Sequence, residues 1–274
     1  MSERWDLIVI GGGPAGSTLA GLVKKHAPER RVLIIEKAPG PRHHVGESLL
    51  PGIIPVLKEL GVYDKIDAAG FPKKLGATFV WGADRTPWDA DFTDGSIQEL
   101  IERHGGIPEK INYAWQVKRS EYDELLLGHA VELGAEAARG ETALRPIEED
   151  GRIAGVVTAG ADGAEISRRC DFLADCSGQD GFLSRFRKTR VYNPGLRNVA
   201  AFAYFRGAKW KYTYTGAPSR LLWKIEKRNL WLKKSNNRAS YQLATRRLRS
   251  HEVYQGRTRS YNSRGVAVFA GRPQ

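Results

Sequence analysis

The fold is decided by residues 5–36, which read WDLIVIGGGPAGSTLAGLVKKHAPERRVLIIE. Residues 5–10 are a short apolar run rich in β-branched side chains, which is typical of a buried parallel strand. A glycine-rich turn follows, then small and apolar residues over 17–25 that predict a helix. A second apolar run over 31–35 predicts another strand. This order of strand, turn, helix and strand predicts an α/β protein with a Rossmann-like domain.

The glycine-rich turn over 11–16 matches the pattern G-x-G-x-x-G. Gly11 permits the tight turn, Gly13 lets the backbone approach a pyrophosphate, and Gly16 lets helix and strand pack closely. The helix N-terminus adds N–H groups and a positive dipole end that favour phosphates. Glu36 ends the second strand, where a carboxylate can accept ribose hydroxyls and would repel the 2′-phosphate of NADP. The pattern predicts a site for the ADP half of a dinucleotide, with these residues: Gly11, Gly13, Pro14, Ala15, Gly16, Glu36 and Lys37.

Charge is distributed unevenly along the 274 residues, whose formal net charge is +12. Residues 209–274 hold 16 Lys or Arg and two acids, which leaves 27 basic and 29 acidic residues in 1–208. A basic segment interleaved with aromatic side chains could bind nucleic acid. We expect instead a solvated basic face or a poorly ordered tail, or a segment altered by truncation or by a change of reading frame.

Composition also bears on the compartment. Cys170 and Cys176 lie six residues apart in an apparently extended segment, too far apart to bridge, so we expect free thiols. The sequence has no apolar run of about 20 residues and no signal-peptide pattern. We therefore expect a cytoplasmic protein without membrane contact, and we predict no metal site.

Three stretches together resemble flavin-dependent halogenases, a branch of the FAD-dependent aromatic monooxygenases. They are GGGPAGSTLA at 11–20, GESLLPG at 46–52 and ADCSGQDGFLSR at 174–185. The resemblance runs from Asp6 to Ala208 and is closest to enzymes of phenolic or pyrrolic substrates, which are often tethered to a carrier protein. It implies FAD, a halide as co-substrate, a separate flavin reductase, and halogenation of an electron-rich aromatic or heteroaromatic ring.

The resemblance also implies further cofactor contacts. Glu47 and Ser48 would lie near the flavin ring, with Ser48 also capping a helix that runs through Leu60. Arg119 would contact the cofactor, as would Gln116, just before a helix that begins with a capping box at Ser120 and runs through Leu133. Alternatively, Glu47 is a solvent-facing acid and Arg119 a plain helix-start residue. A strand ending at Cys176 would bring two more residues near the adenosine: Asp175 and Gly178.

The family's catalytic lysine is best matched by Lys74, in FPKKLGATFVWG at 71–82. It is thought to hold hypohalous acid or to form a covalent adduct with it, and burial in a tunnel would free its amine. The ammonium form could equally hydrogen-bond the oxidant. Without the family context, Lys73 and Lys74 would be read as a solvated strand edge.

The expected organisation is an FAD-binding domain over 1–208, to which 71–118 contributes strands of a substrate-side sheet, and an atypical basic segment over 209–274. A hairpin is expected over 152–158 and 164–169. Two family motifs are absent, the tryptophan-rich Ile-Pro signature and a second flavin motif with Gly-Asp and Asp-Pro. The leading interpretation is an FAD-dependent halogenase. The alternatives are an aromatic hydroxylase of the same fold and an inactive FAD-binding fragment.

Overall fold

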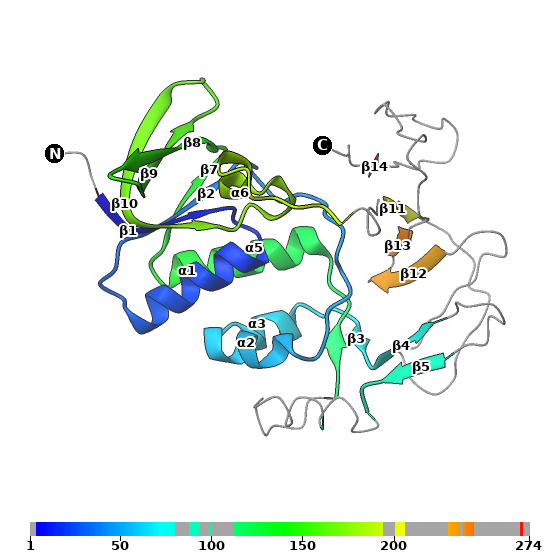
Figure 1. Ribbon diagram of the computed structural model, residues 1–274. Helices are drawn as coiled ribbons and strands as arrows, with labels where there is room; N and C mark the ends of the chain where they lie inside the picture. Colours follow the sequence, from blue (N-terminus) through cyan, green and yellow to red (C-terminus); the bar gives the residue numbers. More distant parts are fainter. Residues whose placement is uncertain are drawn as a thin grey trace, which may run out of the picture. The chain divides into compact units, whose positions relative to one another are not determined.

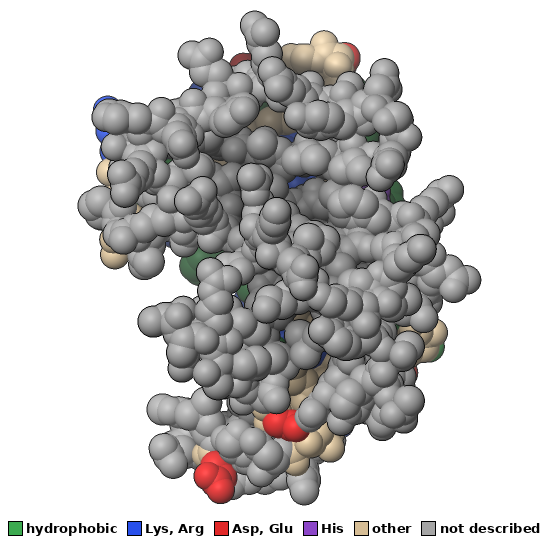
Figure 2. Space-filling view, turned by 90° about the vertical axis from the view of Figure 1, so that its right-hand side faces the viewer, with side chains coloured by type: hydrophobic (Ala, Val, Ile, Leu, Met, Phe, Trp, Pro, Cys, Tyr) green, Lys and Arg blue, Asp and Glu red, His purple; other side chains and the backbone are tan. Residues whose placement is uncertain are grey.

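The structure is a computed structural model that describes residues 4–79, 88–93, 99 and 112–193, and the backbone of four strands after residue 200. The chain divides into two units. The first comprises 1–43, 57–66 and 119–191, and the second comprises 44–56, 67–118 and 192–274. Both acidic and basic side chains of the described residues reach the surface on the face in Figure 2.

The first unit is built on a six-stranded sheet (Figure 1). Its order is β7 (Glu136–Arg139), β2 (Val32–Glu36), β1 (Arg4–Ile10), β10 (Glu165–Asp175), β9 (Arg152–Ala159) and β8 (Thr142–Glu149). Strand β1 pairs in parallel with both β2 and β10, and β7 continues the parallel part beside β2. The predicted Rossmann-like α/β fold is confirmed, as are the first two strands.

Strand β10 joins the parallel part of this sheet to its antiparallel part. Its first residues, Glu165–Arg169, pair antiparallel with β9, and the residues from Arg169 onward pair in parallel with β1. The second strand of the predicted hairpin and the predicted strand ending at Cys176 are thus parts of one long strand. Strand β8 extends the antiparallel part beyond β9.

Two helices, α1 (Pro14–His26) and α5 (Arg119–Glu132), lie on the same face of this sheet (Figure 1). Because strand side chains alternate between faces, Val9 and Ile34 pack with Ala20 of α1 and Leu127 of α5. On the other face, Ile8, Ile10, Leu33 and Ile35 pack against Val156 and against Phe182 of α6 (Phe182–Phe186). Burial of each such large apolar side chain contributes about 1.5–3 kcal/mol to the stability of the fold.

Helix α2 (Ile53–Leu60) begins later than predicted, and α3 (Tyr63–Ala68) follows it. The prediction that Ser48 caps this helix is wrong, because Pro51 disfavours helical geometry at the residue before it. Ile53 N and Ile54 N instead donate to the carbonyls of Leu50 and Pro51 in a turn. None of the helices among the described residues is long and apolar enough to cross a membrane.

The second unit contains two short antiparallel pairs. Strand β3 (Lys73–Lys74) pairs with β6 (Ala114–Trp115), and β4 (Gly76–Phe79) pairs with β5 (Trp88–Asp91). The segment 71–118, which is expected to contribute strands, therefore contains them, and their place in a substrate-side sheet stays a prediction. Trp81, which falls in the same predicted segment, lies outside the described residues.

Four strands near the C-terminus also pair in this unit. They form a sheet in the order β12 (Leu230–Ser235), β13 (Arg238–Leu243), β11 (Ala201–Phe205) and β14 (Phe269–Ala270). The sequence shows no strand pattern over 238–243, yet the backbone there pairs on both sides. This pairing differs from the expectation of an irregular tail. The proposed change of reading frame stays untested.

Candidate functional site

Two positions of the predicted dinucleotide turn accept only glycine. Gly11 follows β1 with φ of +103°, and a Cβ there would lie 2.4 Å from the Cys176 carbonyl oxygen. A Cβ on Gly16 would lie 1.9 Å from the carbonyl oxygen of Gly11. The lack of a side chain at these two positions lets the turn lie closely against the strand and against the first turn of α1, as the sequence pattern predicts.

Gly13 differs from both of them. It is the N-cap of α1 with an extended backbone, and a Cβ built on it meets no described atom within 4 Å. Pro14 occupies the first helical turn, and that turn contains no acidic residue of its own. The turn therefore leaves open space in front of a helix N-terminus, which is the arrangement that accommodates a pyrophosphate.

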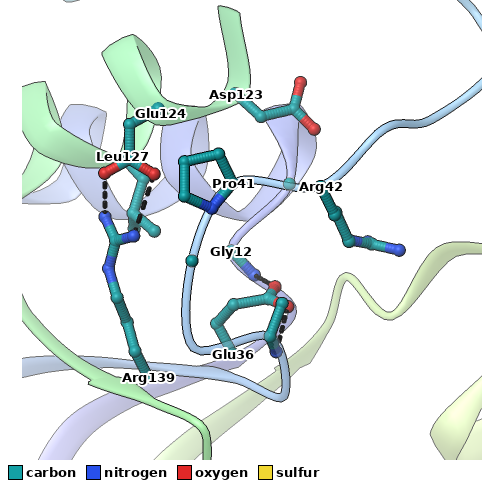
Figure 3. A pocket seen from close by; sticks show the side chains of 11 residues that line it. Gly12, Glu36, Pro41, Arg42, Asp123, Glu124, Leu127 and Arg139 are labelled. Atoms are coloured by element: carbon teal, nitrogen blue, oxygen red, sulfur yellow. Dashed lines mark hydrogen bonds and ion pairs between the residues drawn. The ribbon is translucent and has the colours of Figure 1, made fainter. Parts of the chain in front are cut away.

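The Glu36 carboxylate lies at the end of β2, beside this turn, and is buried. Its Oε2 accepts a hydrogen bond from Gly12 N at 2.7 Å, and its Oε1 accepts one from Ala38 N at 2.9 Å (Figure 3). Two backbone donors thus fix the carboxylate, whose oxygens still have further lone pairs for ribose hydroxyls.

A crevice next to Glu36 is walled by α5 and β7. The guanidinium of Arg139, the residue in register with Glu36, donates to the carboxylate of Glu124 at 2.8 and 2.5 Å (Figure 3). This pairing raises the pKa of Arg139. Arg42 lies at the rim with its side chain directed away from Arg139. The crevice is lined by Gly12, Gly13, Glu36, Ala38, Gly40, Pro41, Arg42, Asp123, Glu124, Leu127 and Arg139.

Arg119 begins α5 and faces Asp123 one turn later. Its Nε and Nη2 donate to the two carboxylate oxygens at 2.6 and 2.9 Å, and the side chains are only 12% and 15% exposed. The predicted capping box is therefore wrong. The helix begins at Arg119, and the carboxylate of Asp123 binds the guanidinium, because a charge-assisted fork is stronger than a cap hydrogen bond.

Three other predicted residues border the loop after β10. Asp175 accepts hydrogen bonds from Ser177 N at 3.1 Å, Ser177 Oγ at 2.5 Å and Leu183 N at 2.7 Å, so it organises this loop. Lys37 forms an exposed ion pair with Asp180, and Gly178 has φ of +64°. Their contact with a cofactor stays a prediction.

The remaining predicted residues lie in the second unit, where three segments run side by side. Ser48 forms a bridge with Gln116, Leu49 N donates to Trp115 O at 3.0 Å, and Val117 N donates to Glu47 O at 2.8 Å. Residues 47–49 thus lie along one side of the segment that contains β6, and β3 pairs with β6 on its other side. Glu47 is buried, so the alternative of a solvent-facing acid is wrong.

Lys73 and Lys74 point to opposite sides of β3. Lys73 is exposed, and its Nζ lies 3.4 Å from Asp67 Oδ1 and 4.5 Å from the centroid of the Tyr113 ring. Lys74 is only 6% exposed; its Nζ donates to Leu49 O at 3.1 Å and lies 5.0 Å from the Phe92 centroid. Burial lowers the pKa of Lys74. Lys74 is thus not part of a solvated strand edge, and its catalytic role stays a prediction.

Sequence reasoning missed most of the crevice wall. The position of Arg42 after the second strand was a usable signal, since the loop there borders the nucleotide in Rossmann folds. The spacing of Asp123 and Leu127 indicates that they share a helix face, but it does not indicate that this face lines the crevice. Arg139 gave no signal, because only the pairing of β2 with β7 places it beside Glu36.

Comparison with known proteins finds halogenases, both by family model and by sequence identity. The tryptophan halogenase family model matches residues 6–105 and 96–217. A flavin-dependent halogenase of Armillaria mellea is 37% identical over 210 residues, which are 74% of this chain and 38% of that protein. The 1H-pyrrole-2-carbonyl-[peptidyl-carrier protein] chlorinase of Pseudomonas fluorescens is 34% identical over 215 residues, 75% of this chain and 46% of that protein.

A solved structure agrees with these relatives. The myxobacterial chondrochloren halogenase CndH, described as a variant of FAD-dependent halogenases, matches with a TM-score of 0.71 and 30% identity, over 89% of this chain and 53% of that one. The chain spans less than half the length of the two curated relatives. The sequence and structural matches agree with the glycine turn, and the chain belongs to the tryptophan halogenase family of flavin-dependent halogenases.

Proposed function

We propose that this chain is the FAD-binding, lysine-bearing part of a halogenase that uses reduced flavin and oxygen to halogenate an electron-rich aromatic or heteroaromatic ring. The observation that carries the proposal is Lys74, a buried amine with one backbone acceptor and no ion pair among the described residues. Its exposed neighbour Lys73 serves as the natural comparison.

The first unit fits the ADP half of FAD. Gly13 leaves open space at the N-terminus of α1, where backbone N–H groups would hold the pyrophosphate, and Glu36 would accept the ribose hydroxyls. When bound in its reduced form, FAD supplies the electrons that, with oxygen and a halide, yield hypohalous acid. Arg119, held by Asp123, and the segment Glu47–Ser48 are the proposed further contacts.

Lys74 would take up the oxidised halogen. As a neutral amine it attacks the halogen of hypohalous acid, so that an N–halogen bond forms, the halogen–oxygen bond breaks, and a proton and hydroxide leave as water. The aromatic carbon then takes the halogen and loses a proton, which restores the amine. As an ammonium, Lys74 would instead hold hypohalous acid by a hydrogen bond.

The proposed partners are a flavin reductase, a halide and an aromatic substrate. A separate flavin reductase would deliver the reduced cofactor, and chloride or bromide would be the co-substrate. One relative is named for a pyrrole carried on a peptidyl carrier protein, so a carrier-tethered ring belongs to the proposed substrate class.

The test is a turnover assay on the 274-residue chain with chemically reduced FAD, oxygen, halide and an electron-rich probe such as resorcinol. The variants are Lys74→Ala and, as the matched control from the same strand, Lys73→Ala. We expect a halide-dependent product from the wild type and from Lys73→Ala, and a loss of at least about a hundredfold in Lys74→Ala.

The mass of the product decides between the alternatives. A product that gains oxygen rather than halogen would make the chain a hydroxylase. No product from a chain that binds FAD would make it an inactive FAD-binding fragment. Wild-type rates in Lys74→Ala would refute the role of Lys74.

A further inference from the structure

We propose that the Leu49 carbonyl and the Phe92 ring are positioning groups for Lys74, the carbonyl fixing the place of the amine and the ring setting its balance between ammonium and free amine. This inference rests on the proposed function of Lys74, but it concerns two groups to which neither the family motifs nor the comparisons give a role. All three residues belong to the second unit.

The acceptor is held rigidly from the neighbouring strand. Leu49 N donates to Trp115 O at 3.0 Å, and the bridge between Ser48 and Gln116 fixes the adjacent residue. Trp115 belongs to β6, and β6 also pairs with β3, in which Lys74 is opposite Ala114. The lysine and its acceptor are therefore anchored to one segment from opposite sides, and the Lys74 side chain reaches from one to the other.

The ring is anchored as firmly. Phe92 is 4% exposed, and its backbone N donates to Leu75 O at 2.9 Å, directly after Lys74 in the chain. The Nζ of Lys74 lies 5.0 Å from the ring centroid, within the range of a cation–π interaction. Phe92 therefore occupies a side of the amine that water would otherwise solvate.

These surroundings act on the amine in opposite directions. Burial disfavours the ammonium and lowers the pKa of Lys74, whereas the negative face of the ring favours the ammonium. The charged and titratable groups on the neighbouring segments include Lys73, Asp67, Glu47, Asp91, Tyr113 and Lys118. None of them forms an ion pair with Lys74 within the part of the chain that the structure describes. We therefore expect the ring and the loss of water to control the protonation of Lys74.

Because burial and the ring act on the amine in opposite directions, different substitutions of Phe92 should shift the pKa of Lys74 in opposite directions. Phe92→Leu keeps the site dry but removes the quadrupole, so the pKa of Lys74 should fall further. Phe92→Ala opens a cavity that admits water, so the pKa should rise toward its ordinary value. Phe92→Tyr keeps the ring and should preserve the wild-type value. A side chain that served only to fill space would not separate Leu from Tyr in this way.

The experiment measures the pH profile of Lys74 acetylation by acetic anhydride, resolved by peptide mass spectrometry in the full chain. A Lys73→Arg background removes the adjacent amine while keeping its charge. The midpoint of the profile reports protonation, and its plateau reports access of the reagent. Relative to the plateau, the rate at a fixed pH below the midpoint should rise about three- to tenfold in Phe92→Leu.

An unchanged or raised midpoint in folded Phe92→Leu, or a midpoint in Phe92→Tyr that moves as far as that of Phe92→Leu, would overturn the role of Phe92. If Phe92→Ala does not unfold cooperatively, the Leu and Tyr variants decide alone. The readout needs no turnover. Loss of the midpoint shifts therefore counts against this inference, and retained halogenation in Lys74→Ala counts against the proposed function.

Discussion

Gly13 and Gly16 lie three residues apart in the same turn, but a methyl group at each would meet different surroundings. At Gly16 it would lie 1.9 Å from a backbone oxygen, which cannot move without opening the turn. At Gly13 it would extend into open space in front of α1, and the backbone φ of −73° suits any residue. Gly16 is therefore required for packing, and we propose that the open space at Gly13 is there for a ligand.

We predict that Gly13→Ala lowers the affinity for FAD by at least about tenfold while changing the free energy of unfolding by less than about 1 kcal/mol. Gly16→Ala should instead destabilise the fold by about 2 kcal/mol or more, because the turn must deform. Thermal denaturation and titration with FAD measure both quantities. Equal losses of stability in the two variants would contradict the difference in packing, and unchanged FAD affinity in Gly13→Ala would contradict the assignment of the open space to a ligand.

Lys74 also predicts a pH dependence of stability. Its folded-state pKa lies below the ordinary 10.5, so between these two values the unfolded chain binds more protons at this residue. Stability in that window rises with pH, and the cost of burial is greatest below the folded-state pKa. Lys74→Met should therefore raise the melting temperature at pH 7, with a gain that shrinks as the pH approaches 10.5.

The control for this prediction is Lys73→Met, because Lys73 is exposed on the same short strand and carries no burial cost. Its melting temperature relative to the wild type should vary little between pH 7 and 10. A gain for Lys74→Met that grows with pH would show that Lys74 is buried as a stabilised ammonium.

At the scale of elements, one buried ion pair ties three strands of the first unit together. Glu141, just before β8, accepts from Arg168 of β10 at 2.6 and 2.7 Å and also from Thr158 of β9. Burial alone would raise the pKa of Glu141, but the bonds from Arg168 and Thr158 bring it below its ordinary value. This network fixes the antiparallel part of the sheet, on which the long strand β10 depends.

We predict that Arg168→Met destabilises the protein by about 3 kcal/mol, because it leaves a buried carboxylate with a hydroxyl as its remaining charge-stabilising partner. Adding Glu141→Gln to that variant should recover part of the loss, since the two residues act as one unit. Chemical denaturation of the three proteins checks this, and strictly additive losses would argue against the coupling.

The sequence predicts those elements whose local pattern agrees with their burial. Strands β1 and β2 are continuous apolar runs because both faces of the sheet are covered, and the glycines fix what lies between them. Strands β7 and β8 read EAAR and TALRPIEE, which lack that pattern, and pairing with neighbours decides their structure. The wall of the crevice escaped prediction for the same reason, since Arg139 meets Glu36 only through pairing of distant strands.

At the scale of the whole molecule, the chain combines a Rossmann-like sheet in its first unit with a second unit that carries a buried lysine. Residues 1–208 are close to neutral, whereas residues 209–274, with 16 Lys or Arg and two acids, carry the net positive charge. The family match extends to residue 217, so the change of composition begins slightly before the match ends. For the first unit we propose, as the central claim, that it holds the adenosine diphosphate end of FAD.

The most direct test of that claim is a competition titration of the purified chain with FAD, ADP and FMN, followed by flavin fluorescence or calorimetry. The account predicts that FAD binds, that ADP displaces it from the same site, and that FMN, which lacks the adenosine, neither binds comparably nor competes. Binding of FMN as tight as that of FAD, or a folded chain that binds neither FAD nor ADP, would contradict it.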